Sequence, residues 1–297
     1  MKLLPELCAG LVCSLAGCAL GQSHPPSASS SSPPQSSHDS QVTLQSSDAA
    51  PASDGTAADG EVNTGQDPTK PLRRLDFRLG YTDLPGGRSA VTQIVRMDIP
   101  NTLTDDGWKL NLRFDMPFVA NDVPSRDNPS GGWEFGAGEF LAQGLLIAPP
   151  DGKFTYGVGL QTIFPTASQD QFGSGRYQIA PTVGGVYQLP EISRGSFAGL
   201  LVRNFFDVGG FDEREQINEL SIQPLFNIAL PDRAFLTFQP DLRIDWEDSA
   251  AVFLPFDVTI GKRIGKSTVV SVELQAPLVS DQNRFEFKAE FRIGFFF

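Results

Sequence analysis

The chain has 297 residues, a net charge of −12 and a hydrophobic content of 40%, which is enough for one or two folded domains. The acidic balance argues against nucleic-acid binding, because that function needs basic surface to neutralise phosphates. All 3 cysteines and both histidines lie before residue 39, and every aromatic residue lies from Phe77 onward. Residues 72–297 therefore exclude disulfides, cysteine metal sites and Ser-His-Asp or Cys-His catalysis. Because every aromatic residue lies in this part of the chain, only residues 72–297 can build an apolar core or a membrane-facing belt.

Residues 1–21 carry the pattern of a secretory signal peptide. Lys2 precedes an apolar run over residues 7–20, which is too short to span a bilayer and ends in small residues. The L-A-G-C sequence at residues 15–18 resembles the lipobox of bacterial lipoproteins, in which the cysteine sulfur is acylated. Two outcomes stay open, namely lipidation of Cys18 or ordinary cleavage after residue 21.

Residues 22–71 are rich in serine and proline and contain few apolar side chains. They cannot bury enough apolar surface to offset the entropy of ordering, so we predict a disordered, loosely extended linker. Such a linker serves either as a lipid-anchored or wall-spanning tether, or as a spacer without a specific partner. The two histidines, His24 and His38, have no neighbouring ligand set, so no metal site is predicted there.

Residues 72–297 alternate between apolar and polar side chains along most of their length, which is the period of β-strands. Turn signals separate most of the alternating segments, and no stretch shows sustained helical periodicity. The glycine-rich segment 133–148 does not fix its own register, and segment 196–206 is apolar on both faces apart from Arg203 and Asn204. We predict twelve strands, over residues 75–81, 91–99, 108–116, 133–148, 154–164, 176–187, 196–206, 219–230, 236–246, 252–260, 270–275 and 285–297.

The last of these segments shows the clearest alternation. From residue 285 onward the odd positions are apolar and mostly aromatic, whereas the even positions 286–292 carry charges of both signs. A strand with this sequence presents one aromatic face and one charged face. A tight turn centred on residues 280–281 would place Glu273 opposite Lys288 on the charged face.

The chain has an even number of alternating segments of about 10 residues each. This pattern is typical of an all-β fold in which antiparallel strands form a transmembrane barrel. We predict a transmembrane antiparallel up-and-down β-barrel of 12 strands over residues 72–297. Aromatic residues near segment ends, such as Trp108 and Trp246, fit the girdles that such barrels place at both membrane interfaces. The alternative is a secreted soluble β-sandwich, which alternates in the same way but more often carries disulfides.

In a barrel the polar faces line a lumen and the apolar faces meet lipid. Carboxylate catalysis needs a paired acidic site, and Asp241 with Asp245, like Glu286 with Glu290, shares a strand face, but a charge ladder along a wet lumen explains them better. We therefore predict no enzyme activity, no cofactor and no metal site. The predicted lumen-lining residues are Arg113, Asp115, Gln223, Gln239, Asp241, Arg243, Asp245, Glu273, Glu286, Lys288, Glu290 and Arg292.

Seven short motifs follow one another along residues 72–297. They are Phe135-Gly136-Ala137-Gly138-Glu139, Phe164-Pro165-Thr166-Ala167, Ala180-Pro181, Ile222-Gln223-Pro224, Asp245-Trp246, Leu254-Pro255 and Gly261-Lys262. In these motifs the chain resembles the meta-pathway phenol-degradation family of transporter-like outer-membrane β-barrels. Glu139 departs from the family pattern, where we expect Asp, and a leader rich in serine and proline is not a usual part of the family.

The resemblance implies a channel in the bacterial outer membrane for passive uptake of small, hydrophobic or aromatic solutes. It also implies outer-membrane lipid and the barrel assembly machinery as partners, because the terminal Phe297 resembles the signal by which such barrels are recognised. Two alternatives stay open. One is a non-conducting structural envelope barrel with a tethering N-terminal linker, and the other is a secreted β-sandwich that binds a ligand.

Overall fold

The structure, a computed structural model, describes residues 63–125, 128–282 and 284–297, all of which belong to one compact unit, Pro51–Phe297. The predicted signal peptide, the lipidation candidate Cys18 and most of the predicted linker lie outside these residues. No helix in the described ranges is long and apolar enough to cross a membrane.

The described residues form fourteen β-strands and two short 3-10 helices. The strands are β1 (Arg74–Leu84), β2 (Arg88–Thr102), β3 (Lys109–Asn121), β4 (Glu134–Ala137), β5 (Phe140–Ile147), β6 (Phe154–Phe164), β7 (Arg176–Gln188), β8 (Phe197–Gly210), β9 (Asn218–Ala229), β10 (Ala234–Phe238), β11 (Leu242–Asp245), β12 (Ala251–Ile264), β13 (Thr268–Ser280) and β14 (Phe287–Phe296). The helices are η1 (Asp170–Phe172) and η2 (Pro231–Arg233).

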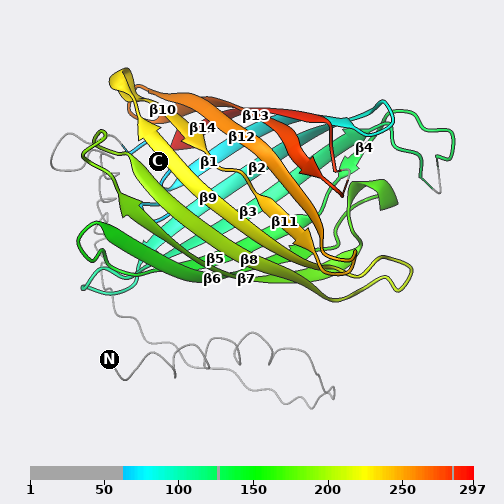
Figure 1. Ribbon diagram of the computed structural model, residues 1–297, viewed down its shortest axis with the longest axis horizontal. Helices are drawn as coiled ribbons and strands as arrows, with labels where there is room; N and C mark the ends of the chain where they lie inside the picture. Colours follow the sequence, from blue (N-terminus) through cyan, green and yellow to red (C-terminus); the bar gives the residue numbers. More distant parts are fainter. Residues whose placement is uncertain (1–62, 126–127, 283) are drawn as a thin grey trace, which may run out of the picture. The chain divides into compact units, whose positions relative to one another are not determined.

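The strands pair antiparallel with their neighbours, and the sheet closes on itself. β1 pairs with β14, from Arg74 opposite Phe296 to Asp83 opposite Phe287, and this pairing completes a barrel (Figure 1). β4 and β5 both pair with β3, while β10 and β11 both lie between β9 and β12, so each of these two pairs is one interrupted strand. The fourteen strands thus make twelve around the barrel, which confirms the predicted fold.

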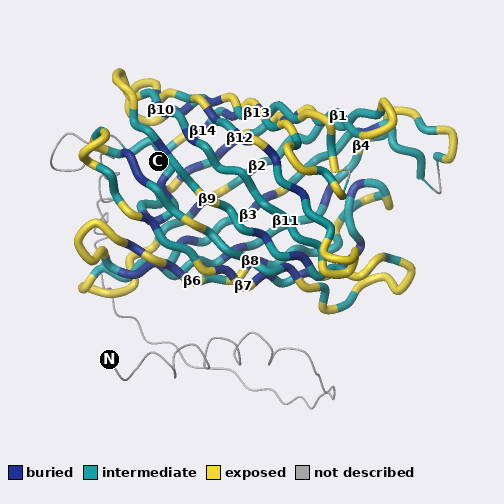
Figure 2. Tube along the Cα trace, viewed as in Figure 1, coloured by how far each residue is buried: buried dark blue, intermediate teal, exposed yellow. Residues whose placement is uncertain are grey.

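The barrel is apolar outside and polar inside. Phe77 and Phe291 are 38% and 48% exposed, whereas their sequence neighbours Asp76 and Arg292 are 0% and 6% exposed. Figure 2 shows buried and half-buried residues along the strands and exposed residues in the connecting loops. A soluble β-sandwich has the opposite distribution, because its apolar faces form the core. The exposed aromatic face and the buried charges therefore exclude the sandwich alternative.

The predicted pairing of Glu273 with Lys288 is wrong. Glu273 lies opposite Glu290, and Lys288 lies opposite Gln275. The connection between β13 and β14 covers residues 281–286 and is longer than a tight turn. Backbone amides at its two ends donate to β12 and β1, at 2.9 and 2.8 Å, instead of extending the hairpin. The register therefore depends on contacts with two other strands, which the hairpin sequence alone does not contain.

The glycine-rich segment 133–148 becomes the interrupted strand β4–β5. At the interruption the Gly138 amide still donates to the β3 backbone (2.9 Å). The Glu139 carboxylate accepts hydrogen bonds from the Ser174 hydroxyl and the Gly175 amide, both at 2.9 Å, in the loop between β6 and β7. A contact between residues distant in sequence thus accompanies the break in the strand.

Candidate solute cavity in the barrel lumen

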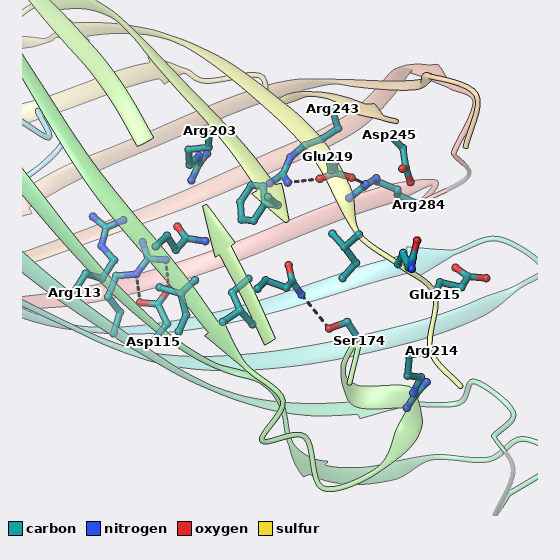
Figure 3. A pocket seen from close by; sticks show the side chains of 18 of the residues that line it. Arg113, Asp115, Ser174, Arg203, Arg214, Glu215, Glu219, Arg243, Asp245 and Arg284 are labelled. Carbon is teal, nitrogen blue, oxygen red and sulfur yellow. Dashed lines mark hydrogen bonds and ion pairs between the residues drawn. The ribbon is translucent and has the colours of Figure 1, made fainter. Parts of the chain in front are cut away.

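The barrel holds a cavity of about 810 Å³ towards the end where β8 ends and β9 begins (Figure 3). Inner-face residues of β2, β3, β5–β9 and β11 form its wall, and loop residues 213–217 together with Arg284 contribute to its rim. A volume of this size is typical of sites that hold small molecules. The geometry of the lining side chains decides which molecules fit.

Arg96 and Asp115 form a bidentate ion pair on this wall. The register places Arg96 of β2 opposite Asp115 of β3, both on the inner face. The Nε and Nη2 atoms of the guanidinium donate to the two carboxylate oxygens at 2.7 and 2.6 Å. Two parallel charge-assisted hydrogen bonds of this kind are stronger than neutral ones. The pair therefore ties β2 to β3 and leaves little net charge facing the cavity.

Arg243 is the centre of a second cluster. Its Nε donates to Asp241 (2.7 Å) and its Nη1 donates to Glu219 (2.5 Å). Arg284, from the connection between β13 and β14, also pairs with Glu219. The ring centroid of Phe205 lies 5.0 Å from the Arg243 guanidinium carbon, which is within the range of cation–π attraction. Two carboxylates thus balance two guanidinium groups in this cluster.

Two other arginines that line the cavity, Arg113 and Arg203, are less completely neutralised. Arg203 donates to the amide oxygen of Gln223 (2.9 Å), while the carboxylate of Asp241 lies 3.9 Å away. The Nε of Arg203 is buried and has no hydrogen-bond partner among the described residues. Within the described ranges, Arg113 donates only through its Nε, to Asp98 (3.0 Å), a carboxylate that it shares with a second arginine. These two side chains therefore carry the least balanced positive charges on this wall.

Apolar side chains share the cavity with these charges. Leu141, Ile163 and Phe205 come from β5, β6 and β8, and Ile217 comes from the loop before β9. They give a bound molecule apolar contact area beside the guanidinium groups of the same wall. The cavity is therefore amphipathic.

Buried apolar side chains gather at the other end of the barrel, where β1 begins and β14 ends. Five apolar side chains of the barrel wall are at most 1% exposed there: Ile147, Val186, Phe197, Phe235 and Val269. The segment 63–73, which precedes β1, packs at the same end. Asp67 accepts a hydrogen bond from the Gln188 amide (2.7 Å), and Lys70 donates to the Gln188 oxygen (3.1 Å). Residues 63–71, which composition places in the linker, thus contact the inner wall.

The predicted lumen residues occupy different levels of the barrel. Four line the cavity: Arg113, Asp115, Arg243 and Asp245. Four lie beside it on the inner wall, in hydrogen bonds with one another or with the cavity arginines: Gln223, Gln239, Asp241 and Glu273. Three belong to the inner face of β14, outside the cavity lining: Lys288, Glu290 and Arg292. Glu286 differs from all of these, because it is exposed in the connection before β14.

Several residues that line the cavity were not among the predicted lumen-lining residues. Arg96 lies on the polar face of its predicted strand, and that signal could have found it. Arg203 belongs to a segment that is apolar on both faces, so its orientation depended on the register of β8. Arg284 and residues 213–217 belong to loops, where alternation gives no information. Within the described ranges, no group of three or more His, Cys, Asp or Glu side chains is arranged to hold a metal ion.

No family model and no curated protein matches the chain. Among solved structures, the barrel is similar to an outer membrane channel from Pseudomonas putida F1, with a TM-score of 0.63 and 17% identity, over 81% of this chain and 99% of that one. It is also similar to the NanC porin, with a TM-score of 0.50 and 13% identity, over 75% of this chain and 98% of that one. At these identities the likeness concerns the fold, which is that of outer-membrane barrels.

Proposed function

We propose that this protein is a channel of the bacterial outer membrane through which small solutes enter passively. The observation that supports the proposal most directly is the polarity of the barrel. An exposed apolar face surrounds a polar lumen that holds a cavity of about 810 Å³, an arrangement called here the inside-out barrel. A closed barrel satisfies its backbone hydrogen bonds between strands and is therefore stable in lipid. The fold likeness to a solved outer membrane channel supports the same reading.

The proposed solutes are small hydrophobic or aromatic compounds, as the resemblance to the phenol-degradation family implies. Leu141, Ile163, Phe205 and Ile217 offer an apolar body a surface inside the cavity. The exposed aromatic side chains of the outer face fit contact with outer-membrane lipid. We infer a transport role rather than a catalytic one.

We also propose that the barrel assembly machinery recognises the terminal Phe297. This residue follows β14, donates its amide to the Arg73 oxygen (3.2 Å) and leaves 55% of its surface exposed. Export through the predicted signal peptide precedes this step, with either lipidation of Cys18 or simple cleavage. The mass of the mature N-terminal peptide distinguishes these two forms, because acylation adds the mass of the fatty chains.

A liposome-swelling assay tests the channel proposal. The probe is phenyl glucoside, an aromatic solute that crosses a bare bilayer slowly because of its sugar. Liposomes that contain the folded protein should swell faster than protein-free liposomes, and heat-denatured protein should give no increase. Equal swelling with and without folded protein would contradict the proposal.

The end of the barrel where β1 begins favours a second candidate function, a non-conducting envelope barrel. The apolar side chains and the segment 63–73 both restrict passage there. Deletion of residues 63–70 should speed swelling if this segment obstructs a channel, whereas deletion of residues 30–37 from the linker is the matched control. If neither the native protein nor the 63–70 deletion conducts, the structural alternative holds.

A further inference from the structure

We propose that the lumen cavity binds amphipathic organic anions, that is, molecules with a carboxylate or sulfonate group on a small apolar or aromatic body. The inference rests on the proposed channel function and adds a charge requirement to its solute class. It is carried by Arg113, Arg203 and the apolar side chains beside them.

Arg203 lacks a full anionic partner in the protein. Asp241, its nearest carboxylate, lies 3.9 Å away and is already engaged on both oxygens. One oxygen accepts a hydrogen bond from the Ser221 hydroxyl (2.6 Å), and the other pairs with Arg243 (2.6 Å). Among the described residues, Arg203 itself donates only to the neutral amide of Gln223. A carboxylate from a ligand would complete its coordination, because a guanidinium binds carboxylates through two parallel hydrogen bonds.

Arg113 has unused donors as well. Its carboxylate partner Asp98 also accepts hydrogen bonds from Arg74 (2.8 Å) and Asn111 (3.0 Å). Only the Nε of Arg113 reaches Asp98, so its two terminal nitrogens donate no hydrogen bond within the described part of the chain. The side chain is 26% exposed and lines the cavity. These nitrogens are therefore available to a bound anion.

The two arginines approach the cavity from different walls. Arg113 belongs to β3 and Arg203 to β8, and Figure 3 shows the two side chains apart, with the lumen between their strands. Besides its attraction to Asp241, Arg203 is repelled by three other arginines, namely Arg243, Arg113 and Arg96. Like charges gathered in a partly desolvated site repel one another, and an anion between them relieves that repulsion.

The apolar lining decides between a simple anion and an amphipathic one. The Phe205 ring centroid lies 5.9 Å from the Arg203 guanidinium carbon, and Leu141 and Ile163 line the same cavity. A ligand whose anionic group meets the arginines can place its apolar body against these side chains. Five acidic side chains also line the cavity, and two of them, Asp115 and Glu219, are already paired with arginine. The other three, Glu213, Glu215 and Asp245, belong to the rim loop and to the end of β11, and Figure 3 shows Glu215 and Asp245 apart from the two arginines.

Three probes of similar shape test the proposal: benzoate, benzyl alcohol and benzylammonium. Binding is measured by isothermal titration calorimetry on the full-length mature protein in lipid nanodiscs at neutral pH. Benzoate should bind at least about tenfold more tightly than the other two, since a hydrogen bond to a charged group contributes more than a neutral contact. Binding of all three probes with equal affinity would overturn the proposal.

Two variants locate the site. Arg203→Gln should weaken benzoate binding by about tenfold or more and leave benzyl alcohol unchanged, and Arg203→Lys should retain part of the preference. Arg203→Gln loses no hydrogen-bonded carboxylate, so the barrel should keep its heat-dependent gel mobility. Arg233→Gln, which removes the same charge from the exposed helix η2, is the matched control and should change nothing. Unchanged benzoate affinity in a folded Arg203→Gln protein would also overturn the proposal.

The two proposals fail in different ways. Swelling in phenyl glucoside without any preference for benzoate removes the anion site and keeps the channel. Benzoate binding that depends on Arg203, without any solute flux, supports the site and removes the channel.

Discussion

Removal of Arg96 should destabilise the barrel strongly, because Arg96→Ala leaves the carboxylate of Asp115 without its bidentate partner. The two side chains are 16% and 9% exposed, so the remaining charge stays largely buried. Breaking a buried ion pair typically costs about 3–5 kcal/mol. Asp115 borders a cavity that admits water, which places the expected loss at the lower end, about 3 kcal/mol.

A double variant separates the ion pair from general packing. Arg96→Met with Asp115→Leu removes both charges at once, so no uncompensated charge remains, and most of the stability should return. Lys153 and Glu191 supply the matched control, in the loop between β5 and β6 and in the loop between β7 and β8. Their pair is exposed on both sides, at 44% and 56%, and its hydrogen bond raises the pKa of Lys153. Lys153→Ala should leave stability unchanged, because water screens such pairs.

The assay is urea unfolding in lipid vesicles, followed by tryptophan emission, with heat-dependent gel mobility as the check on folding. The free energy of unfolding should fall for Arg96→Ala and recover in the double variant. A loss for Arg96→Ala no larger than that for Lys153→Ala would refute the reasoning, because it would mean that the pair is not held on a buried inner wall.

Three further predictions concern the outer face, a turn and the register. Phe291→Arg places a charge on the lipid face of β14 and should cost about 2–4 kcal/mol in the same urea assay; a change near zero would contradict contact with lipid. Ala250 has a φ of 60°, so Ala250→Gly should raise the stability by about 1 kcal/mol, and a lower urea midpoint would count against a left-handed turn. Cysteines at Glu273 and Glu290 should cross-link on oxidation, whereas cysteines at Glu273 and Lys288 should not, as non-reducing gels will show.

The strands could be predicted from the sequence because the alternation of apolar and polar residues is a local property. Apolar residues on one face and charges on the other predicted twelve strands, and the structure has that number once the two interrupted strands are joined. The same alternation left open whether the apolar face is a core or a lipid surface. The burial of Asp76 beside the exposed Phe77 answers that question.

The features that could not be predicted from the sequence depend on contacts between residues that lie far apart along the chain. The register of β13 and β14 follows from amides of residues 281–286 that donate to other strands, so a turn rule applied to the hairpin placed Lys288 wrongly. The segment 63–71 has the composition of a linker, yet it packs against the barrel wall through contacts such as that between Asp67 and Gln188. Arg203 stands in a segment without a polar face, so only the closed barrel shows that it borders the cavity.

The most direct test of the inside-out barrel is the accessibility of single spin labels along β3 in lipid vesicles. Labels at residues 110, 112, 114 and 116 should collide preferentially with oxygen, which concentrates in lipid, and labels at 111, 113 and 115 should not. Labels at 113 and 115 should instead respond to a polar nickel complex that enters the cavity. Equal accessibility at odd and even positions, or an alternation of the opposite phase, would contradict a barrel whose apolar face meets lipid and whose polar face encloses the solute cavity.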